Sequence, residues 1–239
     1  MTRIRWLLLS LLPLLATEAG ASQAASDSVV YQVVPASRLV VKTGKAGLFG
    51  FAGHTHVIRA RTVSGRLIYH PGAPTSSLLL KVPTESLEVL TPPDTAEIRQ
   101  VTEAMREDVL HVDKFPEMTF AADSLGAKSG KMELQLAVTM AGVTRKVPVT
   151  AEVTVGSDSI RARGSFSAKQ TDFGIKPYSG GPAGTVKVAD RVTFCFDLVA
   201  VRGLGQPPSR PLVPAAEAVL VPGCVDKAKV QADTGRRTM

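Results

Sequence analysis

The chain has 239 residues, of which 44% are hydrophobic and 5% aromatic, and its formal net charge is +7. The basic residues are scattered and no dense Lys/Arg run is interleaved with aromatic residues, so the sequence does not favour nucleic-acid binding. The basic balance does favour transient contact with anionic membrane surfaces. Two cysteines are too few for a disulfide framework, although one bridge is allowed in an oxidising compartment.

The first 24 residues have the pattern of a secretory signal peptide. Arg3 and Arg5 precede an apolar run over residues 6–15, and small residues follow up to Ala24. The apolar run is too short to span a bilayer, and no later segment is long enough either. We therefore expect residues 1–24 to be removed and the mature, soluble protein to be periplasmic or secreted.

The first half of the mature chain predicts amphipathic strands. Residues 28–34 and 38–43 have the pattern of one first strand that is interrupted at Pro35. Residues 57–69 and 77–82 have the pattern of the next two strands.

One segment has helical rather than strand periodicity. Residues 95–109 follow Asp94, which is a good N-cap, and Glu97 stands at the capping-box offset. The apolar residues at helical spacing are Ile98, Val101, Met105 and Val109. We expect one amphipathic helix whose apolar stripe packs on the sheet or closes one end of it.

The second half of the chain alternates apolar and polar residues more strictly. A further strand is expected over residues 118–125, and the longest alternating runs cover residues 132–140, 147–155, 160–171 and 186–198. Turn residues separate them at 140–144 and 156–159. Such alternation predicts an all-β protein whose antiparallel strands have one dry and one wet face. A single sheet of this kind must close on itself or find a cover for its dry face.

Composition also divides the chain into segments. Residues 25–202 form one expected domain, and no internal repeat is evident in them. From residue 203 to 239 the sequence is rich in Pro and Gly and then polar, with no sustained period. We expect this tail to be mostly disordered.

Four short blocks, in this order, carry a resemblance to a known family. They are KFPEMTF (114–120), AGVTRKVPV (141–149), QTDFGIK (170–176) and VADRVTFCFDL (188–198). Over roughly residues 29–202 the chain resembles the YceI-like family of exported lipid- and polyisoprenoid-binding proteins. The chain departs from that pattern at Ala141, where a polar or His residue is usual, and at Gln170-Thr171, where Arg is frequent. These departures leave the identity of the ligand open.

The resemblance implies an extended eight-stranded antiparallel, lipocalin-like barrel with one inserted amphipathic helix. It also implies a long apolar cavity that holds an isoprenoid or quinone-like lipid, with no other cofactor and no enzymatic activity. The strand periodicity alone is compatible with a filled interior, because a barrel of about eight strands is only just wide enough for one slender ligand. A ligand-free structural or interaction barrel of the cell envelope is therefore the alternative.

The alternation assigns residues to the inside of such a barrel. The expected cavity lining is Leu80, Phe120, Leu134, Leu136, Val138, Val149, Phe166, Phe194 and Phe196. A shift of one residue in register would invert this assignment.

His54 and His56 are the residues with the most evident candidate chemistry. At i and i+2 on a strand they share a face and can chelate one ion, but no further ligand cluster lies near them in sequence. No nucleophile or partner carboxylate accompanies them either, so we expect no metal site and no catalytic site. We expect both at the mouth of the barrel, as structural groups or against the head group of a ligand.

The sequence also predicts the positions of Cys195 and Phe173. Cys195 falls on the outward face of the last strand, where an exposed thiol would be open to oxidation or to a bridge with Cys224. Phe173, inside the QTDFGIK block, is expected to tuck against the barrel from a turn.

Overall fold

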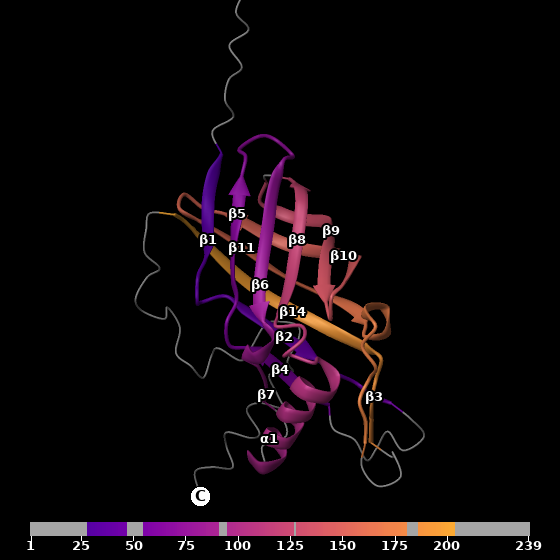
Figure 1. The fold of residues 1–239 in the computed structure, drawn as a ribbon. Coiled ribbons are helices and arrows are strands. Elements are labelled where there is room, and N and C mark those ends of the chain that lie inside the picture. The colour runs from indigo at the N-terminus through magenta and orange to yellow at the C-terminus, as the bar shows by residue number, and fades with distance from the viewer. Residues whose placement is uncertain (1–27, 47–54, 91–94, 127, 181–185, 204–239) are drawn as a thin grey trace, which may run out of the picture.

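The computed structural model describes residues 28–46, 55–90, 95–126, 128–180 and 186–203. The expected signal peptide, His54, Asp94, Cys224 and all of the tail beyond Gly203 lie outside the described residues. Figure 1 shows a strand-rich body with one helical segment beside one of its ends. We call this end the helix end and the opposite one the far end.

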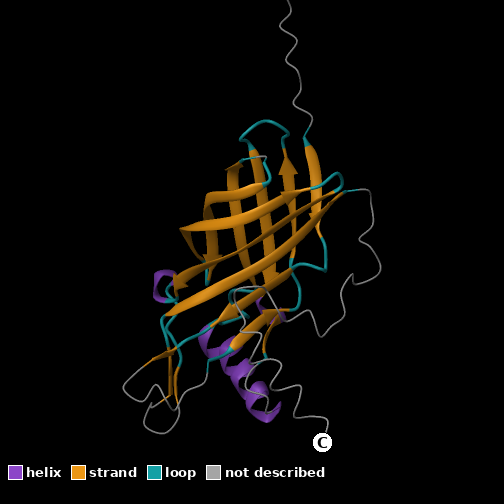
Figure 2. Ribbon diagram, turned by 180° about the vertical axis from the view of Figure 1, so that it is seen from behind, coloured by secondary structure: helices purple, strands orange, loops and turns teal. Residues whose placement is uncertain are grey.

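Eight antiparallel strands close into a barrel, as the sequence predicts. In spatial order they are β1 (Val29–Val33), β5 (Ser64–Tyr69), β6 (Ser76–Pro83), β8 (Glu117–Leu125), β9 (Gly130–Met140), β10 (Val143–Val155), β11 (Ser159–Lys169) and β14 (Arg191–Arg202). The ring closes because β14 also pairs with β1, where Tyr31 stands opposite Arg202. Figure 2, which views the molecule from behind, shows the long strands crossing the body.

The predicted interruption of the first strand is confirmed. The chain after β1 continues as β2 (Arg38–Lys42), which pairs with the same strand, β14, further towards the helix end. Pro35 lies between the two strands, where its missing N–H costs no ladder hydrogen bond.

The expectation of one strand over residues 57–69 is wrong. The segment forms β4 (Val57–Ala60), which pairs with β2, and then β5, which belongs to the barrel. Inward-facing residues are even-numbered in β4, as at Ala60, but odd-numbered in β5, as at Leu67. A continuous strand cannot change parity, so the chain must bend between them.

Short elements extend the barrel at the helix end. After the turn η1 (Thr84–Ser86), strand β7 (Leu87–Val89) pairs with β4 and completes the extension β2–β4–β7. A separate small sheet joins β12 (Ser179–Gly180), β13 (Val186–Val188) and β3 (Lys45–Ala46).

The predicted helix is confirmed as α1 (Thr95–Ala104), which continues into one π-helical turn, η2 (Met105–Val109). Met105 is buried in the core cluster, and Val101 and Val109 pack against it. Arg106 donates two hydrogen bonds to the carbonyl oxygen of Leu87, at 2.9 and 3.2 Å, and so fastens η2 to β7. The helical segment therefore covers the helix end of the barrel (Figures 1 and 2). No helix in the described ranges is both long enough and apolar enough to cross a bilayer.

Aromatic side chains fill the interior near the helix end. The rings of Phe166 and Phe194 are stacked with centroids 4.8 Å apart, and Phe120 meets Phe194 edge to face at 6.1 Å. The ring of Phe196 lies over Gly164, where an added Cβ would be 2.7 Å from the ring. This half of the barrel is a packed core rather than an open cavity.

Candidate functional site

The barrel wall opens between β8 and β9. The two strands pair only from Thr119, opposite Thr139, to Ala121, opposite Ala137. Beyond this point β9 stays paired with β10 along its whole length, whereas β8 leaves β9. The two strands therefore diverge towards the far end (Figure 1).

A bulge in β8 explains the divergence. Ala122 stands opposite Leu78 and Leu125 opposite Ser76, so three steps along β8 match two steps along β6. Ser124 has φ 59°, in the left-handed region that non-glycine residues rarely adopt. An extra residue of this kind bends and twists the bulged strand, which here carries β8 away from β9.

The divergence leaves a crevice of about 490 Å³, a volume in the range of small-molecule sites. Its lining residues are Asp123, Ser124, Leu125, Gly126, Met132, Glu133, Leu134, Gln135, Pro148, Val149 and Thr150. Four of these, Leu125, Met132, Leu134 and Val149, face the interior, while Glu133, Gln135 and Thr150 face outward. The crevice thus passes from a polar outer rim to the apolar inside of the barrel.

Exposure along β9 is higher beside the crevice than towards the helix end. Met132 and Leu134 are only half-buried, although they lie on the same face of the strand as Leu136, Val138 and Met140, which are buried. The inner face of β9 is therefore partly accessible beside the crevice and buried towards the helix end.

A second gap in the wall is filled. The ladder between β10 and β11 ends at Thr150, opposite Ser165, before it reaches Pro148, which has no N–H to donate. The turn η3 (Thr171–Phe173) packs against both strands, and Phe173 is buried to 1% exposure in the core, as expected from its turn.

Asp190 holds this turn in place. Its carboxylate accepts hydrogen bonds from the backbone N–H of Thr171, at 2.9 Å, and from the Thr171 hydroxyl, at 2.8 Å. The backbone hydrogen bond is the main reason that the pKa of Asp190 is lowered from its ordinary value. Of the two gaps in the wall, only the one between β8 and β9 remains open.

All nine residues predicted to line a cavity face the interior, but only two of them line the crevice. Eight are buried in the core, namely Leu80, Phe120, Leu136, Val138, Val149, Phe166, Phe194 and Phe196. The ninth, Leu134, is half-buried, and it lines the crevice together with Val149. Their contact with a ligand stays a prediction.

Sequence reasoning missed Met132 and the rim around Asp123 and Ser124. The parity of residues 132–140 does place Met132 inward, so the alternation could have found it. Nothing in the local sequence marks the bulge that opens the wall beside it.

Comparison with known proteins now places the fold. The sequence pattern of the YceI-like domain matches residues 31–200. The chain belongs to the YceI-like family. A sequence search of curated proteins found no match.

Two solved structures show the same YceI-like architecture. BcnA of Burkholderia cenocepacia is 19% identical, with a TM-score of 0.54, over 70% of this chain and 99% of BcnA. A polyisoprenoid-binding domain from Saccharophagus degradans, implicated in plant cell wall breakdown, is 14% identical, with a TM-score of 0.54, over 73% of this chain and 99% of that domain. At these identities the similarity establishes the fold alone.

His56 does not line the crevice. It is buried immediately before β4, at the extension on the helix end of the YceI-like barrel. Its backbone N–H donates to the hydroxyl of Thr43 at 3.1 Å, and its carbonyl oxygen accepts from the N–H of Thr43 at 3.0 Å. The head-group role of His54 and His56 stays a prediction. Among the described residues, no group of three or more His, Cys, Asp and Glu side chains could hold a metal ion.

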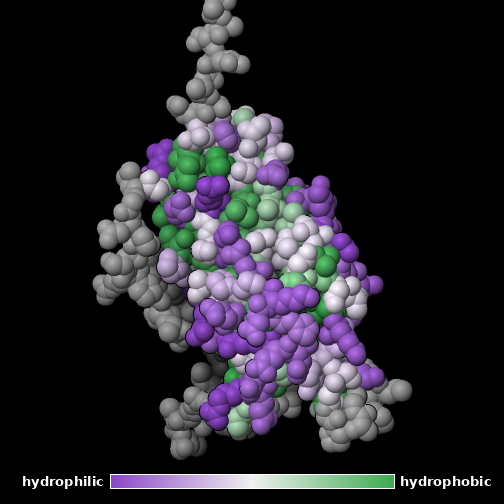
Figure 3. Space-filling view, viewed as in Figure 1, coloured by the Kyte–Doolittle hydropathy of each residue, from purple (hydrophilic) through white to green (hydrophobic). Residues whose placement is uncertain are grey.

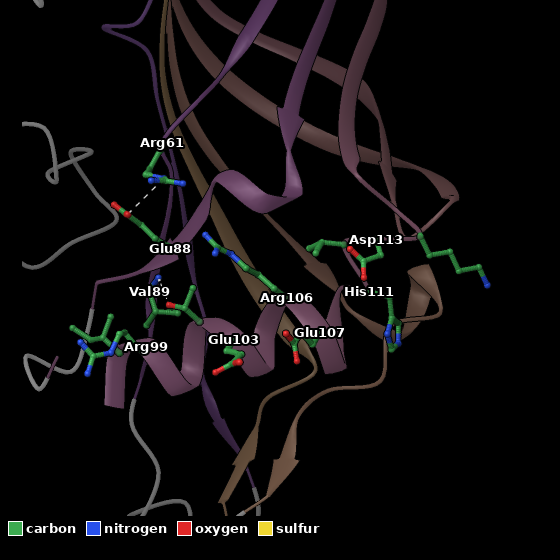
Figure 4. Close-up of a pocket in the computed structure, with 13 residues that line it drawn as sticks. Arg61, Glu88, Val89, Arg99, Glu103, Arg106, Glu107, His111 and Asp113 are labelled. Atoms are coloured by element: carbon green, nitrogen blue, oxygen red, sulfur yellow. Dashed lines mark hydrogen bonds and ion pairs between the residues drawn. The ribbon is translucent and has the colours of Figure 1, made fainter. Parts of the chain in front are cut away.

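A larger cleft of about 1080 Å³ lies between the helical segment, strand β7 and Arg61, which follows β4 (Figure 4). Charged side chains of both signs line it, including Arg61, Glu88, Arg99, Glu103, Arg106, Glu107, Asp113 and Lys114. Glu88 forms ion pairs with Arg59 and with Arg61, the latter at 3.8 Å. An apolar chain in this cleft would displace water from these charged groups without replacing its hydrogen bonds, so the cleft does not suit one.

The outer face of β14 is less exposed than the sequence predicts. Asp197 is 3% exposed and accepts hydrogen bonds from Arg161, at 2.6 and 2.7 Å, and from Arg163, at 3.3 Å. Burial alone would raise the pKa of the Asp197 carboxyl, but the two guanidinium groups outweigh it, so the pKa is lowered. Cys195 faces outward as predicted, but the expectation of an exposed thiol is wrong, because its exposure is 1%.

Proposed function

We propose that this YceI-like barrel binds an isoprenoid or related lipid chain, which enters through the crevice between β8 and β9. The observation that carries the proposal is the half-buried state of Met132 and Leu134 on the inner face of β9. Inward apolar side chains that remain accessible through an open wall are a surface that an apolar chain can cover. The polar rim, with Asp123 and Glu133, keeps a head group in water.

Binding would be driven by burial of the chain. Each buried methylene group contributes about 0.8 kcal/mol, so a five-carbon isoprene unit contributes up to about 4 kcal/mol before the cost of ordering it. Because Phe120, Phe166 and Phe194 pack the helix end, the chain would lie at the crevice, against Met132 and Leu134. The affinity for an isoprenoid chain should therefore rise with its first isoprene units and then level off as the chain becomes longer.

Membership of the YceI-like family supports this proposal, as does the fold shared with a polyisoprenoid-binding domain. The proposal includes export to the periplasm or the exterior, and binding without catalysis. The proposal also includes transient contact with a membrane surface, which Val30, 43% exposed and opposite Ile68 on β5, would face. Apolar side chains show on the surface over the barrel strands towards the far end, whereas polar ones dominate near the helix end (Figure 3).

The test is mass spectrometry of an organic extract from the full chain, purified natively from its own cells. A lipid with an apolar chain at near one copy per protein is the expected result. Repeated absence of any such lipid, together with no binding of added polyprenols of graded length, would overturn the proposal.

The packed helix end favours one alternative, a barrel with no ligand that serves as a structural or interaction module. Phe196 over Gly164 and the stacked Phe166 and Phe194 are features of a filled core. In that case the thermal stability should be unaffected by any added polyprenol, whereas a bound ligand stabilises the folded state by mass action.

A further inference from the structure

An apolar strip lies on the outer face of the wall, where water would be expected. Val40, Val57 and Cys195 form a buried cluster separate from the barrel core, and Leu90 packs against it. In the ladder, Cys195 stands opposite Val40, and both side chains face away from the interior. Their exposures are 1% and 0%, so this strip is covered.

The strip also contains a covalent link, because Cys195 is disulfide-bonded. The sequence has one other cysteine, Cys224. Around it, residues 218–225 read Ala-Val-Leu-Val-Pro-Gly-Cys-Val, with no charged residue.

We propose that Cys195 is bridged to Cys224 of the same chain and that residues 218–225 cover the outer strip formed by Val40, Val57, Leu90 and Cys195. The segment matches the strip in chemistry, since both are apolar. It also has the reach. The seven residue steps along β14 from Cys195 to Arg202 span roughly 23 Å, whereas the 22 steps from Arg202 to Cys224 can extend to roughly 70 Å.

Formation of the bridge is a two-electron oxidation. The two thiols lose two protons and two electrons and form one S–S bond, and the electrons reduce the disulfide of a thiol–disulfide exchange partner to two thiols. This chemistry needs an oxidising compartment, which the expected export of the chain would provide.

The position of the bridge has a consequence for the tail. In the ring of eight strands, β14 is four strands from β8 in either direction, so the strip and the crevice lie on opposite walls. A tail fastened at Cys195 is held away from the crevice. The inference does not depend on the nature of any ligand.

The first test is peptide mapping of the natively purified full chain without reduction. A crosslinked pair of peptides that contain Cys195 and Cys224, in a protein that runs as a monomer, is the expected result. A disulfide-linked dimer would overturn the proposal, and so would two free thiols in protein from an oxidising compartment.

The second test asks whether the segment covers the strip as well as being tethered to it. In the full-length variant Cys224→Ser, the rate at which a thiol reagent alkylates Cys195 is compared with the rate after a further change, Leu220→Asp. The double variant should react about tenfold faster or more, because the charge removes the segment from the strip. Val230→Asp, which lies beyond the segment, is the matched control and should not change the rate. Equal rates with Leu220→Asp would show that something other than residues 218–225 covers Cys195.

Discussion

The ring of Phe115 lies against Gly142, so that a methyl group added to this glycine would stand 2.9 Å from Phe115 Cε1. Phe115 precedes β8, and Gly142 turns β9 into β10. A second contact of this kind joins Thr171, after β11, to Asp190, before β14. The four sequence blocks that resemble the YceI-like family thus meet in two pairs, each of which fixes a connection at the helix end.

The contact with Phe115 predicts a particular cost for Gly142→Ala. Gly142 has φ 75°, which strains an alanine, and the new methyl group would also displace the ring. Gly72 is the matched control, because its φ is 77° but an added Cβ would meet nothing within 4 Å. We expect Gly72→Ala to lower the free energy of unfolding by about 1 kcal/mol and Gly142→Ala by at least about 1 kcal/mol more. Urea unfolding measures both, and equal losses would show that Phe115 yields without cost.

Two leucines on one face of β9 should differ in their contribution to stability. Leu136 is 7% exposed, whereas Leu134 is half-buried at the crevice. Leu136→Ala is expected to lower the free energy of unfolding by about 3 kcal/mol, and Leu134→Ala by about 1 kcal/mol, because less buried surface and less packing are lost. If the two losses were the same in ligand-free protein, Leu134 would be as tightly packed as Leu136.

Leu134 also offers a direct test of ligand binding, which rests on the proposed function. Leu134→Arg places a charge at the crevice, where it can reach water, so the fold should survive while an apolar chain is repelled. The amount of co-purified lipid per chain, measured after extraction, should fall about tenfold or more. Leu79→Arg is the control, since Leu79 faces outward on β6 and its replacement should leave the lipid in place. Unchanged lipid in Leu134→Arg, with native circular dichroism, would rule out the crevice as the binding site.

Asp197 should make stability depend on pH. Its folded-state pKa is lowered by Arg161 and Arg163, so its contribution is fully present above the ordinary carboxyl pKa and is lost as the pH falls through the folded-state value. Asp197→Asn is expected to cost about 2 kcal/mol at pH 7, a figure kept modest because Arg161 is partly exposed. The difference in free energy of unfolding between Asp197→Asn and the unmodified protein should become smaller below about pH 4, where the carboxyl group takes up a proton. Urea unfolding at pH 7 and pH 3 measures it. Asp172→Asn, at an exposed position, should cost little stability at either pH. If the cost of Asp197→Asn were the same at pH 7 and pH 3, the ionised carboxylate of Asp197 would not be the source of the stability.

Much of the barrel follows from sequence alone, because alternation records which side of a strand meets water. The inward set from Leu80 to Phe196, the interruption at Pro35 and the helical stripe at Met105 all depend on local periodicity, which tertiary contacts reinforce here. The division of residues 57–69 into two strands was missed. The inward residues change from even-numbered at Ala60 to odd-numbered at Leu67, and this change indicates two strands only once β4 and β5 are seen to pair with different strands.

The crevice and the outer strip were decided by tertiary structure. Opening of the wall depends on a three-against-two match between β8 and β6, and no local pattern encodes how two strands align. Likewise, alternation places Cys195 outward but cannot say that it is buried. Sequence thus determined the class of fold and the inward faces, since these depend on each residue's own polarity and its place in the period. Which inward faces remain accessible, and which outward face is buried, depended on contacts between segments far apart in the chain.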